Sequence, residues 1–365
     1  MRRMGISMLF FFLCFVSTGW QQAHAQTKPP FITFDAPGAG TIPNQGQGTF
    51  PAQITGSGLT VGSFTDANGV NHGFVRALDG KITTFDAPGA GSGAGQGTIV
   101  NAATDAGIIA GVVFDGYGVF HGVFGPPEHL RTFDAPGAGT SSHQGTNATG
   151  INSEGTLSGD YVDGNGVPHG YVRSPDGTIT SFDPSDSVFT AASTMGLNRA
   201  GAVTGPYMDA SGTEHGFVRT PDGKVISFDA PGAGTGPGFG TVPSMIADSG
   251  TIPGAYADAN NVIHAFLRFA DGNIITFDVP GAGEEANTGT LANAADLEGL
   301  ITGQSIDDNG ISHGFVRTPN RKDFFFDAPG EGIQATVPLS INVWGVVTGY
   351  FVDANGVSHA FLRLP

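Results

Sequence analysis

Cysteine and basic residues are both scarce in this 365-residue sequence. Its one cysteine, Cys14, lies in an N-terminal segment that we expect to be removed, so the mature chain would have no thiolate nucleophile, zinc–thiolate site or disulfide. Only 15 Lys and Arg stand against 32 Asp and Glu, a formal net charge of −17. Such a charge repels phosphate backbones and anionic lipid surfaces, which argues against nucleic acid and membranes as partners.

The first 25 residues have the pattern of an export signal. Arg2 and Arg3 precede an apolar run over residues 6–16, and residues 23–25 read Ala-His-Ala, the small-x-small form of a cleavage site. The apolar run is too short to span a bilayer, for which about 20 residues are needed. We therefore predict a secreted protein without membrane insertion, cleaved after Ala25, with residues 26–365 as one mature domain.

Glycine and proline are abundant, with 59 and 23 copies, and the glycines recur at fixed spacing. Seven histidines follow one another at 46 to 49 residues, each with Gly fourteen and ten residues before it and Asp six before it. These histidines are His72, His121, His169, His215, His264, His313 and His359, and the aspartates are Asp66, Asp115, Asp163, Asp209, Asp258, Asp307 and Asp353. An F-D pair also occurs seven times, ending at Asp35, Asp86, Asp134, Asp183, Asp229, Asp278 and Asp327. This periodicity indicates seven copies of one unit rather than an unpatterned, disordered chain.

Each unit predicts four short strands and no helix. The runs are typified by "GTIVNAATDAG", "IIAGVVFD", "HGFVR" and "KITTFD", rich in Val, Ile, Thr and Phe and bounded by Gly, Pro, Asn or Asp. The Asn-Gly of "DANG" suits a tight hairpin, so the last three runs should be antiparallel neighbours. Because four-stranded units of 40 to 50 residues are typical of propeller blades, we predict an all-β, seven-bladed β-propeller. A β-solenoid is the alternative, disfavoured because its repeats are usually shorter.

The two ends of the chain predict how the ring closes. The mature chain begins with "FITFD", a fourth strand without the first three, and ends with "SHAFLRLP", a third strand without a fourth. We expect residues 31–35 to pair beside residues 359–364, which would leave no exposed blade edge. The predicted blades span approximately residues 36–86, 87–134, 135–183, 184–229, 230–278, 279–327 and 328–365.

Threading the chain through such blades places the Asp-x-Asn-Gly turns, the histidines and the "DAPGAG" loops on one face. Six of these loops are followed by a Thr, at Thr49, Thr98, Thr146, Thr241, Thr290 and Thr336. We interpret the repeated Asp and His as a structural network that fastens each loop to the next blade. Calcium is the alternative for fourteen carboxylates on one face, but the turns lack the alternating oxygen ligands and distal Glu of a calcium loop. We therefore expect no cofactor.

An Arg four residues after the His recurs in six units, at Arg76, Arg173, Arg219, Arg268, Arg317 and Arg363, and we expect it to pair with a carboxylate of a neighbouring strand. Catalysis would require departures from the repeat, and these are Glu128, His129, Arg131, His143, Asp186, Glu284, Glu285, Arg321 and Lys322. They fall in different blades and on different faces, and they form no Ser/His/Asp, H-E-x-x-H or paired-carboxylate constellation. We accordingly predict no catalytic residue.

Units reading "GxITGxYxDxNGxxHGFVR", two copies of "HAF" (residues 264–266 and 359–361) and "TFDAPGAG" between units resemble the HAF family of extracellular repeats over residues 31–365. The resemblance implies an exported bacterial repeat protein and brings no activity or catalytic residue. We predict a secreted binding or structural surface module that offers its loop face to a protein or polysaccharide. The alternative is a propeller-based enzyme, such as a glycan hydrolase or lyase, with its site at the axial channel.

Overall fold

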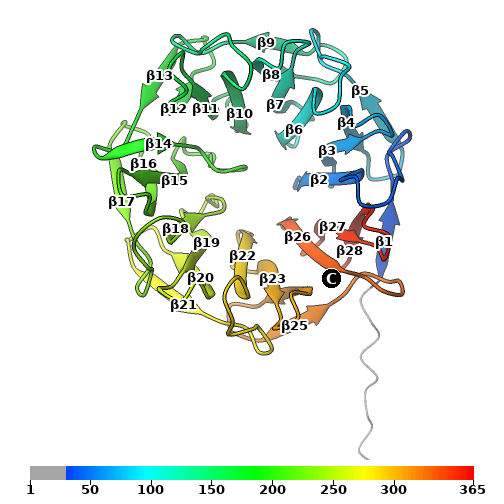
Figure 1. Cartoon of the computed structure of the whole chain (residues 1–365), viewed down its shortest axis with the longest axis vertical. Coiled ribbons are helices and arrows are strands. Elements are labelled where there is room, and N and C mark those ends of the chain that lie inside the picture. Colours follow the sequence, from blue (N-terminus) through cyan, green and yellow to red (C-terminus); the bar gives the residue numbers. More distant parts are fainter. Residues whose placement is uncertain (1–29) are drawn as a thin grey trace, which may run out of the picture.

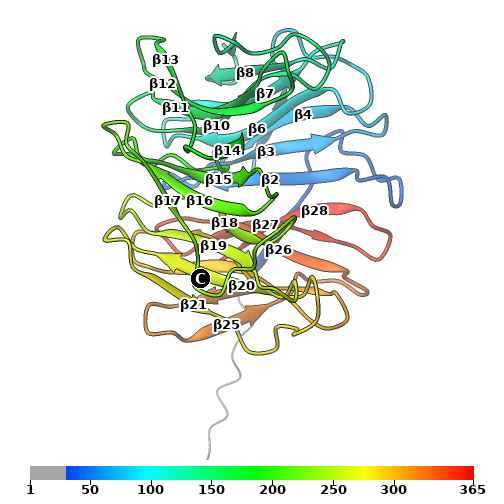
Figure 2. The same cartoon turned by 60° about the vertical axis from the view of Figure 1, so that its left-hand side comes forward.

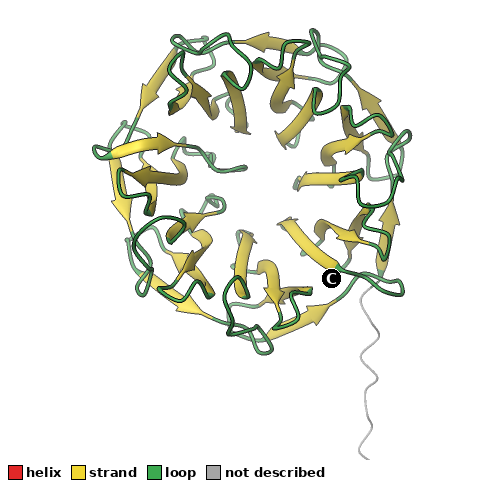
Figure 3. Ribbon diagram, viewed as in Figure 1, coloured by secondary structure: helices red, strands yellow, loops and turns green. Residues whose placement is uncertain are grey.

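The computed structural model describes residues 30–365, so the predicted signal peptide, residues 1–25, lies outside the described residues. Within residues 30–365 the regular structure is all β, with 28 strands in one hydrogen-bonded sheet and no helix (Figure 3). Accordingly, this part of the chain has no apolar helix of membrane-spanning length. The all-β prediction is confirmed.

The strands fall into groups of four that correspond to the predicted runs. The first strands, nearest the centre, are β2 (Gly48–Ile54), β6 (Gly97–Ala103), β10 (Gly145–Ile151), β14 (Ser187–Thr190), β18 (Gly240–Pro243), β22 (Gly289–Ala295) and β26 (Ala335–Ile341). The second strands are β3 (Thr60–Thr65), β7 (Ile109–Phe114), β11 (Leu157–Val162), β15 (Val203–Asp209), β19 (Ile252–Ala257), β23 (Ile301–Ile306) and β27 (Val347–Val352). The third strands are β4 (Asn71–Arg76), β8 (Phe120–Gly125), β12 (Pro168–Arg173), β16 (Glu214–Arg219), β20 (Ile263–Arg268), β24 (Ser312–Arg317) and β28 (Ser358–Arg363). The outer strands are β5 (Ile82–Phe85), β9 (Arg131–Phe133), β13 (Ile179–Phe182), β17 (Val225–Phe228), β21 (Ile274–Phe277), β25 (Asp323–Phe326) and β1 (Phe31–Phe34).

The groups stand around a central axis, with their outer strands at the periphery (Figures 1 and 2). Strand β1, from the start of the described chain, pairs antiparallel with β28, from its end, in the register Phe31 to Arg363 and Phe34 to Ala360. A parallel bridge joins the third strand of one group to the first strand of the next at six boundaries, for example Asn71 to Gly97. The boundary between β12 and β14 has no such bridge among residues 30–365.

Two of the repeated glycines are explained by the backbone. Gly58 and its equivalents lie in the turn between first and second strands at positive φ, +84° for Gly58, a conformation that side chains disfavour. Gly62 and its equivalents lie in the second strand, where a Cβ would collide with the backbone of the first strand, at the carbonyl of Phe50 in the first unit. Each group can therefore pack its two inner strands closely.

The core lies between adjacent groups rather than at one centre. The residue two positions after each His is fully buried: Phe74, Val123, Tyr171, Phe217, Phe266, Phe315 and Phe361. Six of these are aromatic, and five of the six lie against a phenylalanine of the neighbouring outer strand, as Phe266 does against Phe228 with ring centroids 6.0 Å apart. This packing fixes each group against the group before it.

Candidate functional site: a repeated face and a variable axial cavity

The seven histidines each lie between the two repeated aspartates of their own unit. The His Nδ1 atoms are 2.8 to 2.9 Å from the F-D carboxylates, and the Nε2 atoms are 3.6 to 3.9 Å from the turn carboxylates. In the last unit the partner of His359 is Asp35, from the opposite end of the chain. Each imidazole thus joins the third strand, the fourth strand and the hairpin turn.

The turn aspartates are occupied by their own backbone. In the third unit, the Asp163 carboxylate accepts the N–H groups of Asn165 and Val167, both at 2.8 Å. The bond from Val167, with smaller help from Asn165 and His169, holds the pKa of Asp163 below its usual value. Burial alone would raise the pKa of Asp66, but the same set of bonds lowers it. These carboxylates therefore stabilise the hairpin in their ionised form.

The loop threonines connect neighbouring units. The Thr98 hydroxyl accepts the backbone N–H of Ala87 at 2.9 Å, from the loop that follows the F-D pair of the preceding unit. The equivalent bond is made by Thr49, Thr146, Thr241, Thr290 and Thr336. Among residues 30–365, no group of three or more His, Cys, Asp or Glu is arranged to hold a metal ion.

The repeated arginines do not behave as we expected from the sequence. Each lies over a phenylalanine of the preceding group, as Arg268 does over Phe228 with its guanidinium carbon 5.0 Å from the ring centroid. Only Arg317 forms the expected ion pair among the described residues, with Asp323 at 2.9 Å. The alternation of side chains along a strand predicts on which face of the strand an arginine lies, but not what it meets there. Here its neighbour across the group boundary is an aromatic ring and not a carboxylate.

The other end of the ring carries an axial cavity of about 590 Å³, lined by the turns between first and second strands. In each unit the residue sixteen positions before the His lines it, and these residues are Gly56, Asp105, Ser153, Arg199, Asp248, Leu297 and Val343. These residues differ almost completely from unit to unit. They contrast with the opposite face, which carries the seven histidines with their aspartates and is called the histidine face below. Two of the carboxylates hold the neighbouring turn, because Asp105 accepts the N–H of Ser57 at 3.0 Å and Asp248 accepts that of Arg199 at 2.7 Å.

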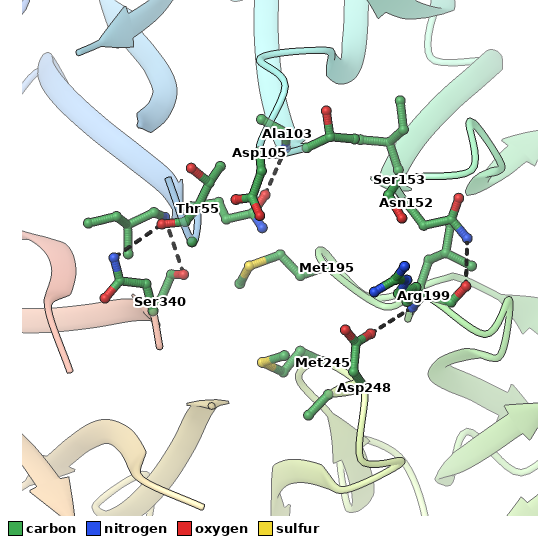
Figure 4. A pocket seen from close by; sticks show the side chains of 18 of the residues that line it. Thr55, Ala103, Asp105, Asn152, Ser153, Met195, Arg199, Met245, Asp248 and Ser340 are labelled. Atoms are coloured by element: carbon green, nitrogen blue, oxygen red, sulfur yellow. Dashed lines mark hydrogen bonds between the residues drawn. The ribbon is translucent and has the colours of Figure 1, made fainter. Parts of the chain in front are cut away.

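The floor of the cavity comes from the segment after β14, which extends toward the centre of the ring in Figure 1. Met195, in the left-handed region at φ +57°, donates its N–H to Thr149 and accepts from Ile246, thus contacting both neighbouring units. Figure 4 shows Met195 and Met245 in the middle of the cavity, surrounded by Asp105, Arg199 and Asp248. Met195 also lines a second cavity of about 310 Å³. Because it borders both spaces, Met195 lies between them along the axis.

One tryptophan, Trp344, follows directly after residues that line the axial cavity, although it does not line the cavity itself. The Trp344 side chain is 70% exposed, and its indole N–H donates to the carbonyl of Gly56 at 3.0 Å, across the boundary between β26 and β2. Its neighbours Asn342 and Val343 line the cavity, as does Gly56 itself. The hydrogen bond holds the indole in place while leaving most of its surface open to solvent.

The departures from the repeat that the sequence singled out do not assemble at this cavity. None of Glu128, His129, Arg131, His143, Asp186, Glu284, Glu285 or Lys322 lines it, and Arg321 lines a different cavity. Sequence reasoning missed the seven turn residues and Trp344 because it looked for additions to the repeat. The sequence does show one sign of the site: when the seven units are compared, no residue type occurs more than twice at the position sixteen residues before the His.

A polar cluster in the third unit was also missed. Asn147 donates to the Asp160 carboxylate at 3.3 Å, accepts from Asn101 at 3.1 Å, and receives the Tyr171 hydroxyl on its backbone carbonyl at 3.0 Å. Burial raises the pKa of Asp160 to about 7, only partly offset by the bond from Asn147. Other units have Ser, Val, Pro, Ala, Gln or Tyr at the Asp160 position.

No protein-family model matches the sequence, and no curated protein is similar to it. Solved structures do match in fold. A streptogramin B lyase superposes with a TM-score of 0.58 at 17% identity, covering 92% of this chain and 98% of the lyase. The BP39L lectin from Burkholderia pseudomallei gives 0.57 at 10% identity over 86% and 94%, and a puromycin hydrolase gives 0.52 at 13% over 87% and 50%. The chain therefore has a propeller-like all-β fold, one that is found with lyase, lectin and hydrolase functions.

Proposed function

We propose that this chain is an exported carbohydrate-binding protein whose ligand site is the axial cavity together with Trp344. The scaffold in this proposal is a seven-bladed propeller that the strand at residues 31–35 closes, consistent with the pairing of β1 and β28. Export rests on the signal-like first 25 residues and on the resemblance to HAF repeats. A structural role for the face that carries the seven histidines is part of the proposal, and it is supported by the hydrogen bonds that its carboxylates make with their own turns and histidines.

The observation that carries the proposal is an exposed, fixed indole next to residues that line a cavity with both polar and apolar walls. Sugars combine a flat apolar ring face with a rim of hydroxyls, so their sites pair an aromatic surface with carboxylates, amides and guanidiniums. Trp344 offers the first, and Ser153, Arg199 and the Oδ2 atoms of Asp105 and Asp248, whose Oδ1 atoms hold neighbouring turns, offer the second. The cavity volume of about 590 Å³ falls within the range of small-ligand sites. Because the indole is already held by Gly56, little side-chain entropy would be lost on binding.

The test is a thermal-shift screen of residues 26–365 against soluble polysaccharides and oligosaccharides, followed by titration calorimetry of any hit. A ligand at a hundred times its dissociation constant would add about 2.7 kcal/mol to the stability. We expect Trp344→Ala to weaken the hit at least tenfold, whereas Trp344→Phe should keep part of the affinity. The matched control is Tyr117→Ala, since Tyr117 is 84% exposed on the hairpin turns of the opposite face. Equal losses from both alanine variants, or no glycan hit at all, would turn the search to protein partners.

A propeller-based enzyme is the second candidate, favoured by one observation. Asp160 is a carboxyl group with a pKa of about 7, near neutrality, where a general acid or base works best. Its partner Asn147 is bonded to Asn101, which lines the 310 Å³ cavity behind Met195. If a glycan that binds is also turned over, Asp160→Asn should abolish turnover while leaving binding intact; unchanged turnover would remove Asp160 from the reaction.

A further inference from the structure

A further cavity, of about 700 Å³, lies between the fifth and sixth groups and shares Leu297 with the axial cavity. Its walls include Phe269 after β20, Ile275 on β21, Leu297 in the turn before β23, and Pro319 after β24. Ile275 and Leu297 are 39% and 57% exposed. Thr220 and Thr318 occupy the position of Phe269 in the units on either side, so Phe269 adds an apolar wall that they lack.

The charges around this cavity leave one cation without an acidic partner. Arg317 is neutralised by Asp323 and lies 4.4 Å over the ring of Phe277. Asp296 uses one carboxylate oxygen for the turn N–H groups of Glu298 and Leu300, and burial raises its pKa. The exposed Glu298 is the other acid lining the cavity. Arg321 has no carboxylate within 4.0 Å in the part of the chain that the structure describes.

Arg321 also occupies a strained backbone position. Its φ is +64°, and four other units have a glycine at this place in the turn: Gly80, Gly177, Gly223 and Gly272. A non-glycine residue in the left-handed region costs of order 1 kcal/mol, and such strain is concentrated at functional sites. The sixth unit therefore places a guanidinium at the mouth of an apolar-walled cavity at a cost in stability.

We propose that this cavity binds a small organic anion: a flat apolar body against Phe269, Ile275 and Leu297, with a carboxylate or sulfonate on Arg321. The volume of about 700 Å³ suits a molecule of that size. The formal charge of −17 repels anions over the surface as a whole, so the unpaired Arg321 makes this cavity a distinct place for one. The site borders the axial cavity, because Leu297 lines both, but Phe269 and Arg321 line this cavity and not the axial one, so the proposal stands whether or not the chain binds carbohydrate.

The test is a fluorescence titration of residues 26–365 with 8-anilinonaphthalene-1-sulfonate, an aromatic sulfonate, at low salt. We expect saturable binding at one site per chain. Arg321→Gly, which restores the glycine of the other units, should weaken binding at least tenfold while keeping or raising the Tm. Phe269→Thr, which restores the neighbouring threonine, should weaken it as well.

The matched control is Lys322→Gln, because Lys322 is the adjacent residue, loses the same charge and does not line the cavity. Its affinity should stay within twofold of the parent chain. The uncharged analogue N-phenyl-1-naphthylamine should bind more weakly and be insensitive to Arg321→Gly. The proposal is overturned if no saturable binding occurs, if Arg321→Gly binds like the parent, or if Lys322→Gln is equally impaired.

Discussion

The two faces of this protein differ in how far their residues repeat from unit to unit. On the histidine face the same Asp, His and Thr recur from unit to unit, and their polar atoms bond to one another and to the backbone. At the axial end, equivalent positions carry Gly, Asp, Ser, Arg, Asp, Leu and Val. A group required by every unit is expected to serve the fold, whereas a group that differs in each unit is free to serve a ligand.

Repeated and unique residues also differ in their effect on the stability of the fold. The repeated turn aspartates are satisfied by their hydrogen bonds, as their lowered pKa values show, whereas four of the repeated arginines keep a buried Nε without a hydrogen-bond partner among the described residues. The unique residues carry costs: Met195 and Arg321 are at positive φ, Asp160 has a raised pKa, and Asp296 has a buried oxygen without a partner among the described residues. Such local violations are expected where function, rather than folding, selects the residue. Removing repeated groups should therefore destabilise the protein, and reverting unique ones should stabilise it.

The largest expected loss comes from removing the strand at the start of the ring. A chain that begins at Ala36 lacks β1, its pairing with β28, the bond from Asp35 to His359 and the contacts of Phe31 with Phe326 and Phe361. We expect a loss above about 5 kcal/mol and a fall in Tm of at least about 10 °C in calorimetry. A chain beginning at Pro30 is the control, and equal melting of the two would contradict a closing role for β1.

The next effect is a gain from Asp160→Asn, and it depends on pH. Because the folded pKa is raised, from 3.8 to about 7, the protonated acid is favoured in the fold, and this contribution is lost as pH rises from about 4 through about 7. Asparagine does not titrate, so the variant should be more stable at pH 8 by at most about 4 kcal/mol, and by little at pH 4. Urea unfolding at both values measures this, and a difference independent of pH would refute it.

A smaller loss is expected from His215→Ala on the repeated face. The histidine bonds Asp229 at 2.8 Å and stacks on Tyr207, with ring centroids 5.0 Å apart. Burial would lower the pKa of His215, but Asp229 and Asp209 raise it, so its contribution is greatest at low pH and is lost as pH rises through the folded pKa. We expect a loss of about 1 to 2 kcal/mol, larger at pH 6 than at pH 8. Chelator should leave the Tm unchanged; a fall in Tm with chelator would instead indicate a stabilising metal bound to the protein.

Periodicity made the repeated half of the molecule predictable. A residue that recurs in every unit, such as the His and its two Asp, reveals its strand position and its face. The partner differs from the prediction, because each His lies between the two Asp of its own unit and the loop Thr makes the bond between neighbouring units. Trp344 and Met195 occur once, so no pattern places them, and the inward course of the segment around Met195 follows from contacts to two neighbouring units. The arginine pairs were predicted wrongly because strand alternation does not show which residue of the neighbouring group a side chain contacts. That contact depends on how the groups pack against one another.

The smallest expected change in stability comes from replacing one atom, the buried Oδ2 of Asp296. Asn152 and Asn342 each accept two turn N–H groups on Oδ1, and Asn198 accepts one. All three donate Nδ2 to a carbonyl of the next unit, at 3.1 to 3.4 Å. In the sixth unit Asp296 makes the same turn bonds, but its Oδ2 is buried without a partner among residues 30–365. Asp296→Asn would place a donor there and should stabilise the fold by about 1 kcal/mol.

Here too the sign depends on pH. Burial raises the pKa of Asp296, so the parent chain loses stability as pH rises through the folded pKa, and the gain from Asp296→Asn should be larger at pH 7.5 than at pH 4. Thermal melts at the two pH values measure it. A variant less stable than its parent at both pH values would mean that Asp296 stabilises the fold. The rule that unique residues cost stability would then fail at this position.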